Sequence, residues 1–245
     1  MYKVEKNKFK GDRCFIVGTG SSLDNVDLSP LKNEITISLN LILLKEDFVP
    51  NYLCIADTTV MENHYDIIFN DKMNNGFYVI SNGCLISDKY PDGHGNCHNR
   101  SGATCRGIHL DSKYENIHIV KHNEKSGINI NHMENREKLL KTDEWYIDEE
   151  LKTISSYGGS TIDNLTIPLA VYLGFKKIYL LGCDGGWNHF YDSHKKDGKR
   201  DWINYRHVIK KLDKLGISLV NCDSTNAFEE LEYIKYEDIV SEENN

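Results

Sequence analysis

Seven short runs of apolar, β-branched and aromatic residues recur along the chain, and helical segments separate several of them. Runs of this length and composition are typical of β-strands. Strands that alternate with helices predict a mostly parallel sheet with helices on both faces, which is a Rossmann-like α/β fold. The predicted strands are residues 14–18, 35–40, 52–57, 77–81, 116–121, 177–182 and 217–222.

Two of the intervening segments carry helix signals. The first spans residues 160–174, where Ser160 and Asp163 form a weak capping box and Gly174 is placed to end the helix. Pro168 lies inside this segment and predicts a kink or a later start. The second spans residues 201–216 and ends at a glycine.

The chain of 245 residues suits one large domain. We therefore predict a single nucleotide-binding domain over residues 1–228. Residues 83–115 break the alternation with Gly, Asn, Asp and His, and they predict an insertion or long loop. Residues 185–200 predict a lid loop, and residues 229–245 predict a loosely packed acidic C-terminal tail.

Composition excludes some classes of protein and favours a cytoplasmic location. The net charge of −8 argues against nucleic-acid binding, although residues 192–200 are locally basic. No apolar run approaches the roughly 18 residues of a membrane span, and the basic, polar first 13 residues do not resemble a secretory signal. The cysteine count is odd, at seven, and four cysteines lie in or beside predicted strands, which favours buried, reduced thiols.

Small and polar residues follow five of the predicted strands. In a parallel sheet the carboxyl ends of the strands lie at one edge, where ligands of α/β proteins bind. The same residue types also favour ordinary turns, but their repetition favours a shared site. The residues are Gly18–Ser22, Asn40, Asp57–Thr59, Ser81–Gly83 and Asp184–Gly186.

The sequence Gly-Thr-Gly-Ser-Ser after the first strand predicts a phosphate site. Glycine lets a ligand approach the backbone closely, and the start of a following helix offers unpaired N–H groups. The motif is not the dinucleotide fingerprint, because Leu23 occupies the third glycine position, and no Gly-Lys-Ser/Thr of a P-loop follows.

Several motifs together resemble two related families. They are V-G-T-G-S-S-L (17–23), strands ending in Asn40 and Asp57, S-S-Y-G-G-S-T (155–161) before an apolar helix, and G-F-K-K-I-Y-L-L-G-C-D (174–184). One family is the bacterial lipooligosaccharide sialyltransferases. The other is named for archaeal 6-hydroxymethylpterin pyrophosphokinase and includes flagellin-glycosylating motility accessory factors. The resemblance covers about half of the chain, residues 13–60 and 155–222.

The resemblance implies a Rossmann-like domain with a small lid that uses a CMP-sugar without a metal. It implies that His194, or His189 as second choice, is the catalytic base and that Tyr191 binds the leaving phosphate. By this resemblance the nucleotide and its phosphate would be held by Gly18, Thr19, Gly20, Asn40, Asp57, Gly159 and Ser160. We predict that Ser21, Gly158 and Asp184 bind the nucleotide or its phosphate as well.

This sequence departs from the family pattern at three of these positions. The families usually carry Asn and Pro where this chain has Thr19 and Ser21, and the sialyltransferases carry Asn at the position of Asp57. A carboxylate beside a phosphate is unfavourable unless it binds a cation or a hydroxyl group. Asp57 is therefore expected to bind sugar hydroxyls or a metal.

The sequence also bears on metals. A D-x-D motif, common where a diphosphate sugar is bound with a metal, is absent, which favours metal-independent chemistry. Asp57 and Asp184 sharing a magnesium ion is the alternative. His94, Cys97, His98 and Cys105 have zinc-binding side chains, but their spacing does not match a zinc finger.

The predicted function is an inverting, metal-independent transfer of a sugar from a nucleotide-activated donor, with a CMP-sugar favoured, to a hydroxyl group. The acceptor is a glycan, a protein or a small molecule, and the sequence does not distinguish these three. The sequence also does not determine whether the protein forms a homo-oligomer. One alternative is a pyrophosphokinase-like transfer of diphosphate from ATP with magnesium. The other is a nucleotide-binding module without catalysis.

Overall fold

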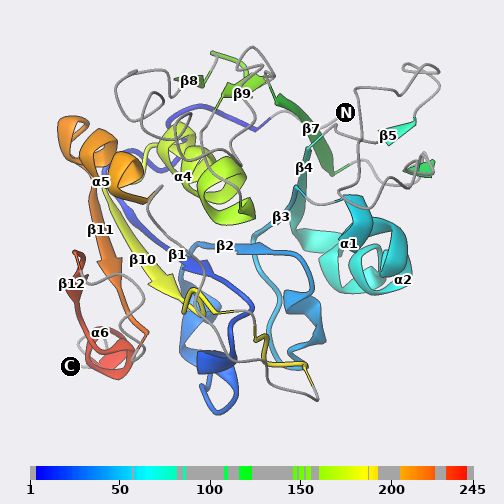
Figure 1. Cartoon of the computed structure of the whole chain (residues 1–245), viewed down its shortest axis with the longest axis horizontal. Coiled ribbons are helices and arrows are strands. Elements are labelled where there is room, and N and C mark those ends of the chain that lie inside the picture. Colours follow the sequence, from blue (N-terminus) through cyan, green and yellow to red (C-terminus); the bar gives the residue numbers. More distant parts are fainter. Residues whose placement is uncertain are drawn as a thin grey trace, which may run out of the picture.

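The computed structural model describes residues 4–56, 58–81, 85–86, 108–109, 116–122, 146–147, 149–151, 153–155, 160–186, 188–192, 205–223 and 230–241 (Figure 1). Ten strands form one sheet in the order β12-β11-β10-β1-β2-β3-β4-β7-β9-β8. The strands are β1 (Arg13–Val17), β2 (Thr36–Leu39), β3 (Tyr52–Ile55), β4 (Phe77–Ser81), β7 (Ile117–His122), β8 (Tyr146–Ile147), β9 (Thr153–Ser155), β10 (Lys177–Leu181), β11 (Ser218–Asn221) and β12 (Glu232–Tyr233).

The sheet reverses its order beside β1. Successive strands extend from β1 through β2, β3, β4 and β7 to β9, and the chain then returns to place β10 on the other side of β1. All of these neighbours are parallel, and only β8 runs antiparallel, to β9. The topological switch point is therefore at the neighbouring strands β1 and β10, and open α/β sheets bind ligands at the carboxyl ends of such strands. The prediction of a Rossmann-like, mostly parallel sheet is confirmed, and all seven predicted strands are present.

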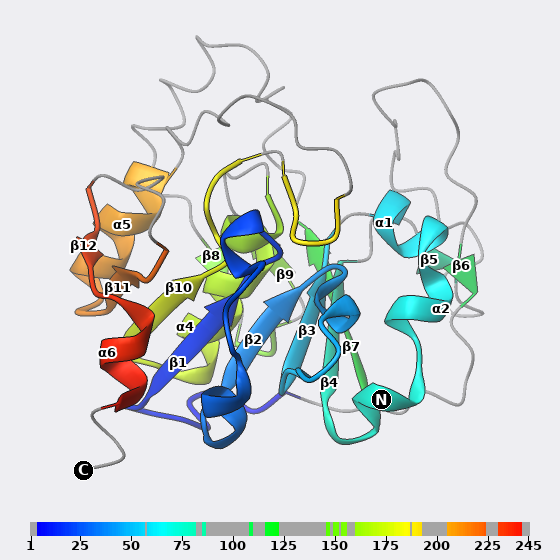
Figure 2. The same ribbon diagram turned by 90° about the horizontal axis from the view of Figure 1, so that it is seen from below.

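Helices cover both faces of the sheet (Figures 1 and 2). One face packs against the π-helix η7 (Ile162–Thr166), α4 (Ile167–Leu173) and α5 (Tyr205–Lys214). The other face packs against α6 (Tyr236–Ser241) and several short elements. These are the 3₁₀ helices η1 (Ser21–Leu23), η2 (Ser29–Asn33), η3 (Ile42–Leu44) and η4 (Asp71–Asn75), together with α1 (Thr58–Asn63) and α2 (Tyr65–Ile68).

The helix predicted over residues 160–174 forms, with a change of pitch inside it. Its first turns are π-helical and become α-helical at Ile167, one residue before Pro168, which cannot donate a backbone hydrogen bond. Gly174 ends the helix in the left-handed conformation, with φ of +95°, as predicted. The second predicted helix corresponds to α5.

The C-terminal segment is not the loosely packed tail that its acidic composition suggested. Residues 230–241 add the edge strand β12 and the helix α6. Tyr236 and Ile239 of α6 are each only 4% exposed. The rings of Tyr236 and Phe15 pack edge to face, with their centroids 6.4 Å apart. The spacing of three residues places both apolar side chains on one face of the helix, so the acidic side chains between them need not enter the core.

Other predictions lie partly outside the described residues. Of residues 83–115, the structure describes the pairs β5 (Leu85–Ile86) and β6 (Ile108–His109), which form a separate two-stranded sheet. His94, Cys97, His98 and Cys105 lie outside the described residues. The four described cysteines, Cys14, Cys54, Cys183 and Cys222, are buried free thiols. Among the described helices, none combines the length and the apolar character that crossing a bilayer requires.

Candidate active site

The glycine corner, residues 18–22, follows β1 and packs directly against the turn that follows β10. The backbone N–H of Gly18 donates to the carbonyl oxygen of Leu181 at 2.7 Å, and that of Gly20 donates to Gly182 at 2.8 Å. These bonds continue the β1–β10 pairing past the ends of both strands. The two turns therefore form one rigid unit at the switch point.

The glycines are needed because the chain itself approaches closely. A Cβ atom on Gly18 would lie 2.2 Å from the carbonyl oxygen of Gly182, and a Cβ atom on Gly20 would lie 1.4 Å from Oδ1 of Asp184. We expected the absent side chains to make room for a ligand. In the structure they make room for the β10 turn and for the carboxylate of Asp184.

Asp184 binds donors that we had predicted for phosphate. Its Oδ2 accepts hydrogen bonds from the backbone N–H of Ser22 at 2.8 Å and from the hydroxyl group of Ser21 at 3.2 Å. The helical element that begins inside the corner, η1, is only three residues long. The expectation of a helix start with unpaired N–H groups is therefore wrong at Ser22.

Asp223 is a buried member of the site that the sequence analysis missed. Its carboxylate is 2% exposed and accepts hydrogen bonds from Gly182 N at 2.6 Å, Cys183 N at 2.7 Å and the hydroxyl group of Ser22 at 2.9 Å. It thus joins the ends of β1, β10 and β11. Asp223 follows the predicted strand 217–222 directly, so the rule that polar residues follow strands could have found it.

Burial raises the pKa of Asp223 from its ordinary value of 3.8 to about 6. The hydrogen bonds from Cys183 N, Gly182 N and Ser22 lower the pKa, whereas the nearby charge of Asp184 raises it. Two carboxylates in one corner repel each other. The corner as it stands therefore favours neutral or cationic partners over a free anion.

The buried cysteines do not provide a nucleophile. Burial is the main cause that raises the pKa of each of Cys14, Cys54, Cys183 and Cys222, the last to about 12. A thiolate is the reactive form, and these groups remain protonated at neutral pH. Covalent chemistry at these four positions is therefore disfavoured.

Residues 188–192 lie against the glycine corner. Nδ1 of His189 lies 2.9 Å from Oγ1 of Thr19, and the backbone N–H of Phe190 donates to the carbonyl oxygen of Thr19 at 3.0 Å. The imidazole stacks on the ring of Tyr191, with ring centroids 5.0 Å apart and an angle of 8°. The structure thus brings a histidine and a tyrosine from the predicted lid loop onto the corner.

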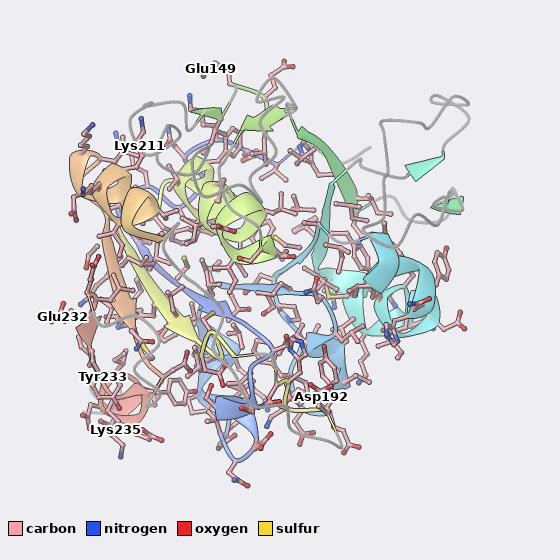
Figure 3. All side chains as sticks on the ribbon, viewed as in Figure 1. Glu149, Asp192, Lys211, Glu232, Tyr233 and Lys235 are labelled. Carbon is pink, nitrogen blue, oxygen red and sulfur yellow. The ribbon has the colours of Figure 1, made fainter. Side chains whose placement is uncertain are left out.

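A tight turn holds this segment in place. Asp192 accepts a hydrogen bond from the backbone N–H of His189 at 2.8 Å, and its own N–H donates to the carbonyl oxygen of His189 at 3.0 Å. Asp192 lies beyond the end of β10 (Figure 3). Lys45 lies 5.8 Å from the ring centre of Phe190 and donates to the carbonyl oxygen of Leu23 at 2.6 Å.

The end of β2 carries two buried polar atoms without a hydrogen-bond partner in the described part of the chain. They are Oδ1 of Asn40 and Oγ of Ser38. Asn40 adopts the left-handed conformation, with φ of +50°, which asparagine tolerates better than most residues. Such atoms are costly unless water or a ligand pairs with them. We predicted Asn40 as a site residue and missed Ser38, which the strand pattern concealed.

Ser160 lies at the same edge of the sheet, because the helix between parallel strands β9 and β10 must begin where β9 ends. Its backbone N–H and its hydroxyl group both donate to Oδ1 of Asp163, at 3.0 and 2.8 Å. Asp163 is 2% exposed and Ser160 is half-buried, so the contact between them is partly buried. Four predicted site residues, Asp57, Gly158, Gly159 and His194, lie outside the described residues.

A cavity of about 460 Å³ lies elsewhere, between α5 and the edge strands β11 and β12. Its walls include Leu212, Ile217, Leu219 and Leu231. It opens beside the start of β11, whereas the candidate site lies at the carboxyl ends of the strands. None of the predicted site residues that the structure describes lines it.

The sequence matches no family model, and the search of curated proteins found no match. Among solved structures, the chain is similar to the MAf glycosyltransferase from Magnetospirillum magneticum AMB-1, with 16% identity and a TM-score of 0.49. That match covers 95% of this chain and 35% of the other, so this chain spans about a third of its length.

The chain is also similar to the sialyltransferase CstII from Campylobacter jejuni, solved with the substrate analogue CMP-3FNeuAc. The identity is 14% and the TM-score 0.47, over 91% of this chain and 86% of the other. A structure of the sialyltransferase CST-II with a trisaccharide acceptor and CMP gives 14% identity and a TM-score of 0.48, with the same coverage.

Proposed function

We propose that the protein is a glycosyltransferase that moves a sugar from a nucleotide-activated donor, preferably a CMP-sugar, to a hydroxyl group. The observation that carries this proposal is the contact of His189 with the glycine corner at the switch point, with Tyr191 stacked on the imidazole. This edge is where Rossmann-like sheets bind nucleotides. An imidazole and a phenol at that edge supply hydrogen-bond donors of the kind that stabilise the leaving phosphate in transfer from a sugar phosphate.

In the proposed reaction the acceptor oxygen attacks the anomeric carbon on the face opposite the phosphate. A new carbon–oxygen bond forms, and the bond from that carbon to the phosphate oxygen breaks, so the configuration inverts. The electrons of the broken bond stay with the phosphate of the departing CMP. A histidine removes the proton of the acceptor hydroxyl group, and His194 is our first choice for this base.

The unpaired atoms at the end of β2 support a nucleoside site. Oδ1 of Asn40 accepts hydrogen bonds, and the hydroxyl group of Ser38 can both donate and accept. The amino group of cytosine and the hydroxyl groups of ribose are donors that would satisfy the Asn40 oxygen. Because an unsatisfied buried acceptor is costly, we expect a nucleoside to gain affinity there.

The donor phosphate can bind at the glycine corner in two ways. By the first route it displaces the carboxylate of Asp184 from Ser22 N and the Ser21 hydroxyl group, and by the second it binds beside the carboxylate. The first route costs the two hydrogen bonds of Asp184 and moves one negative charge out of the corner. We propose the first route, because the same two donors suit a phosphate oxygen as well as a carboxylate.

One observation favours a second function. Asp184 and Asp223 bring two carboxylates into the corner, and such a pair attracts a cation. Diphosphate transfer from ATP, with magnesium held by Asp184 and Asp57, is therefore the alternative. The described residues contain no group of three metal-binding side chains, and Asp57 lies outside them.

A thermal-shift panel of CMP, UDP, GDP, ADP and ATP, with and without magnesium, separates these functions. We expect the largest stabilisation from CMP, independent of magnesium. Stabilisation only by ATP with magnesium would replace our proposal by the alternative. Binding of CMP without release of CMP from any of a panel of CMP-sugars would indicate a module without catalysis.

The His194→Ala variant tests the base. We expect it to lose turnover by about 10²- to 10⁴-fold, the usual contribution of a general base, while the thermal shift with CMP stays unchanged. The matched control is His64→Ala, which removes a histidine from the turn before α2. Full turnover in His194→Ala would remove this residue from the mechanism.

A further inference from the structure

Thr19 has a different environment from the one expected of a phosphate ligand. It is 3% exposed, and in the described structure its hydroxyl group pairs with Nδ1 of His189 at 2.9 Å. The carbonyl oxygen of Thr19 also accepts the N–H of Phe190, so both polar atoms of the residue contact the 188–192 segment. Thr19 is therefore hydrogen-bonded to His189.

The hydrogen bond constrains which nitrogen of His189 carries the proton. In neutral imidazole one nitrogen donates and the other accepts, and the partner of one nitrogen fixes the role of the other. If Nδ1 carried the proton, it would donate to Thr19, and the buried Thr19 hydroxyl proton would lose the acceptor that the structure provides. If Thr19 donates to Nδ1, that proton is satisfied, and buried hydroxyl groups strongly favour such pairing.

We propose that Thr19 donates its proton to Nδ1 and holds neutral His189 with the proton on Nε2. His189 then acts as a hydrogen-bond donor that stabilises the negative charge on the leaving phosphate, and it is not the base. Thr19 is a positioning residue that acts through the imidazole. This inference rests on the proposed glycosyl transfer for the role of His189, but the position of the proton can be measured without any substrate.

The surroundings keep the ring in one orientation. Tyr191 stacks on one face of the imidazole, and the turn closed by Asp192 fixes the backbone of His189. The charged groups nearby are Asp192 on the same turn, Asp184 in the corner and Lys45 beside Phe190. The proton is to be located at about pH 8.5, well above the reference pKa of histidine, about 6.5.

The first test is nitrogen NMR of the imidazole in the intact protein, with the His189 signals assigned by their loss in His189→Gln. We expect wild type to show Nε2 protonated and Nδ1 accepting. Thr19→Ser keeps the hydroxyl group and should keep this pattern, whereas Thr19→Val should show a mixture of the two forms. A proton on Nδ1 in wild type, or an identical pattern in Thr19→Val, would overturn the inference.

The second test compares two replacements of His189 in the release of CMP from CMP-N-acetylneuraminic acid. Gln places an amide N–H near the position of Nε2, so it replaces a donor but not a base. We expect His189→Gln to stay within about tenfold of wild type in kcat, while His189→Ala loses about 10²- to 10³-fold, the usual effect of losing one such donor. An equal loss in both variants would show that His189 is a base.

The same assay tests Thr19. We expect Thr19→Val to lower kcat with little change in KM, and Thr19→Ser to restore it. Circular dichroism tests whether Thr19→Val keeps the fold. If Thr19→Val does not fold, Thr19→Ser still tests the proposal, because it keeps the hydroxyl group and should keep the activity. If wild type releases no CMP from any donor, the proposed function fails, and the NMR result still decides the position of the proton.

Discussion

The buried carboxylate of Asp223 makes folding stability depend on pH in a way that a single substitution removes. Its pKa is about 6 in the folded protein against an ordinary value of 3.8, a difference of about two units. At about 1.4 kcal/mol per unit, the linked free energy is about 3 kcal/mol. The folded state binds this proton more tightly than the unfolded state, so the contribution is complete below pH 3.8 and is lost as the pH rises through 6.

Asp223→Asn cannot titrate, so it should lack this dependence. Asn keeps one acceptor oxygen, and one of the N–H groups of Gly182 and Cys183 loses its partner, at a cost of about 1–3 kcal/mol at every pH. Wild type should therefore exceed the variant in stability most at pH 4. The difference should shrink by about 2.4 kcal/mol between pH 4 and pH 7, because part of the linked free energy is already lost at pH 4, and the variant can then equal or exceed wild type.

Urea unfolding of both proteins at half-unit steps from pH 4 to pH 7 measures the difference directly. The control is Asp213→Asn, which removes an exposed carboxylate from α5 and should leave the pH dependence of wild type unchanged. A difference between wild type and Asp223→Asn that stays constant over this range would refute the reasoning, because it would mean that Asp223 is ionised alike in the folded and unfolded chain.

Three further substitutions, one of them with a matched control, test the packing of the corner, the place of the phosphate and the packing of the C-terminal segment. Gly18→Ala should lose about 1–3 kcal/mol of unfolding free energy or more, because its Cβ would press on the carbonyl of Gly182; Gly186→Ala, with its nearest atom at 3.7 Å, should melt close to wild type. Asp184→Asn should bind CMP several-fold more tightly by calorimetry if phosphate displaces this carboxylate, and equal or weaker binding would place the phosphate elsewhere. Tyr236→Ala should lose about 3–5 kcal/mol, whereas a loosely packed tail would lose almost nothing.

The fold was largely predictable because its signals are local. Each of the seven predicted strands is a short run rich in apolar, β-branched or aromatic residues, and the end of α4 at Gly174 follows from the conformation that glycine adopts there. The short strands β8, β9 and β12 were missed, since two or three residues carry no periodic pattern. Helix α6 was missed because acidic residues surround its two core side chains.

What the sequence alone determined is the architecture: a parallel sheet, its carboxyl edge, and the polar residues gathered there. What only the tertiary structure decided is which of those residues meet. Thr19 pairs with a histidine 170 positions later, Ser21 with Asp184 across 163 positions, and Ser22 with Asp223 across 201 positions. Local propensity carries no information about such contacts. They depend on the order of strands in the sheet and on how closely the turns after β1 and β10 can pack where both contain glycine.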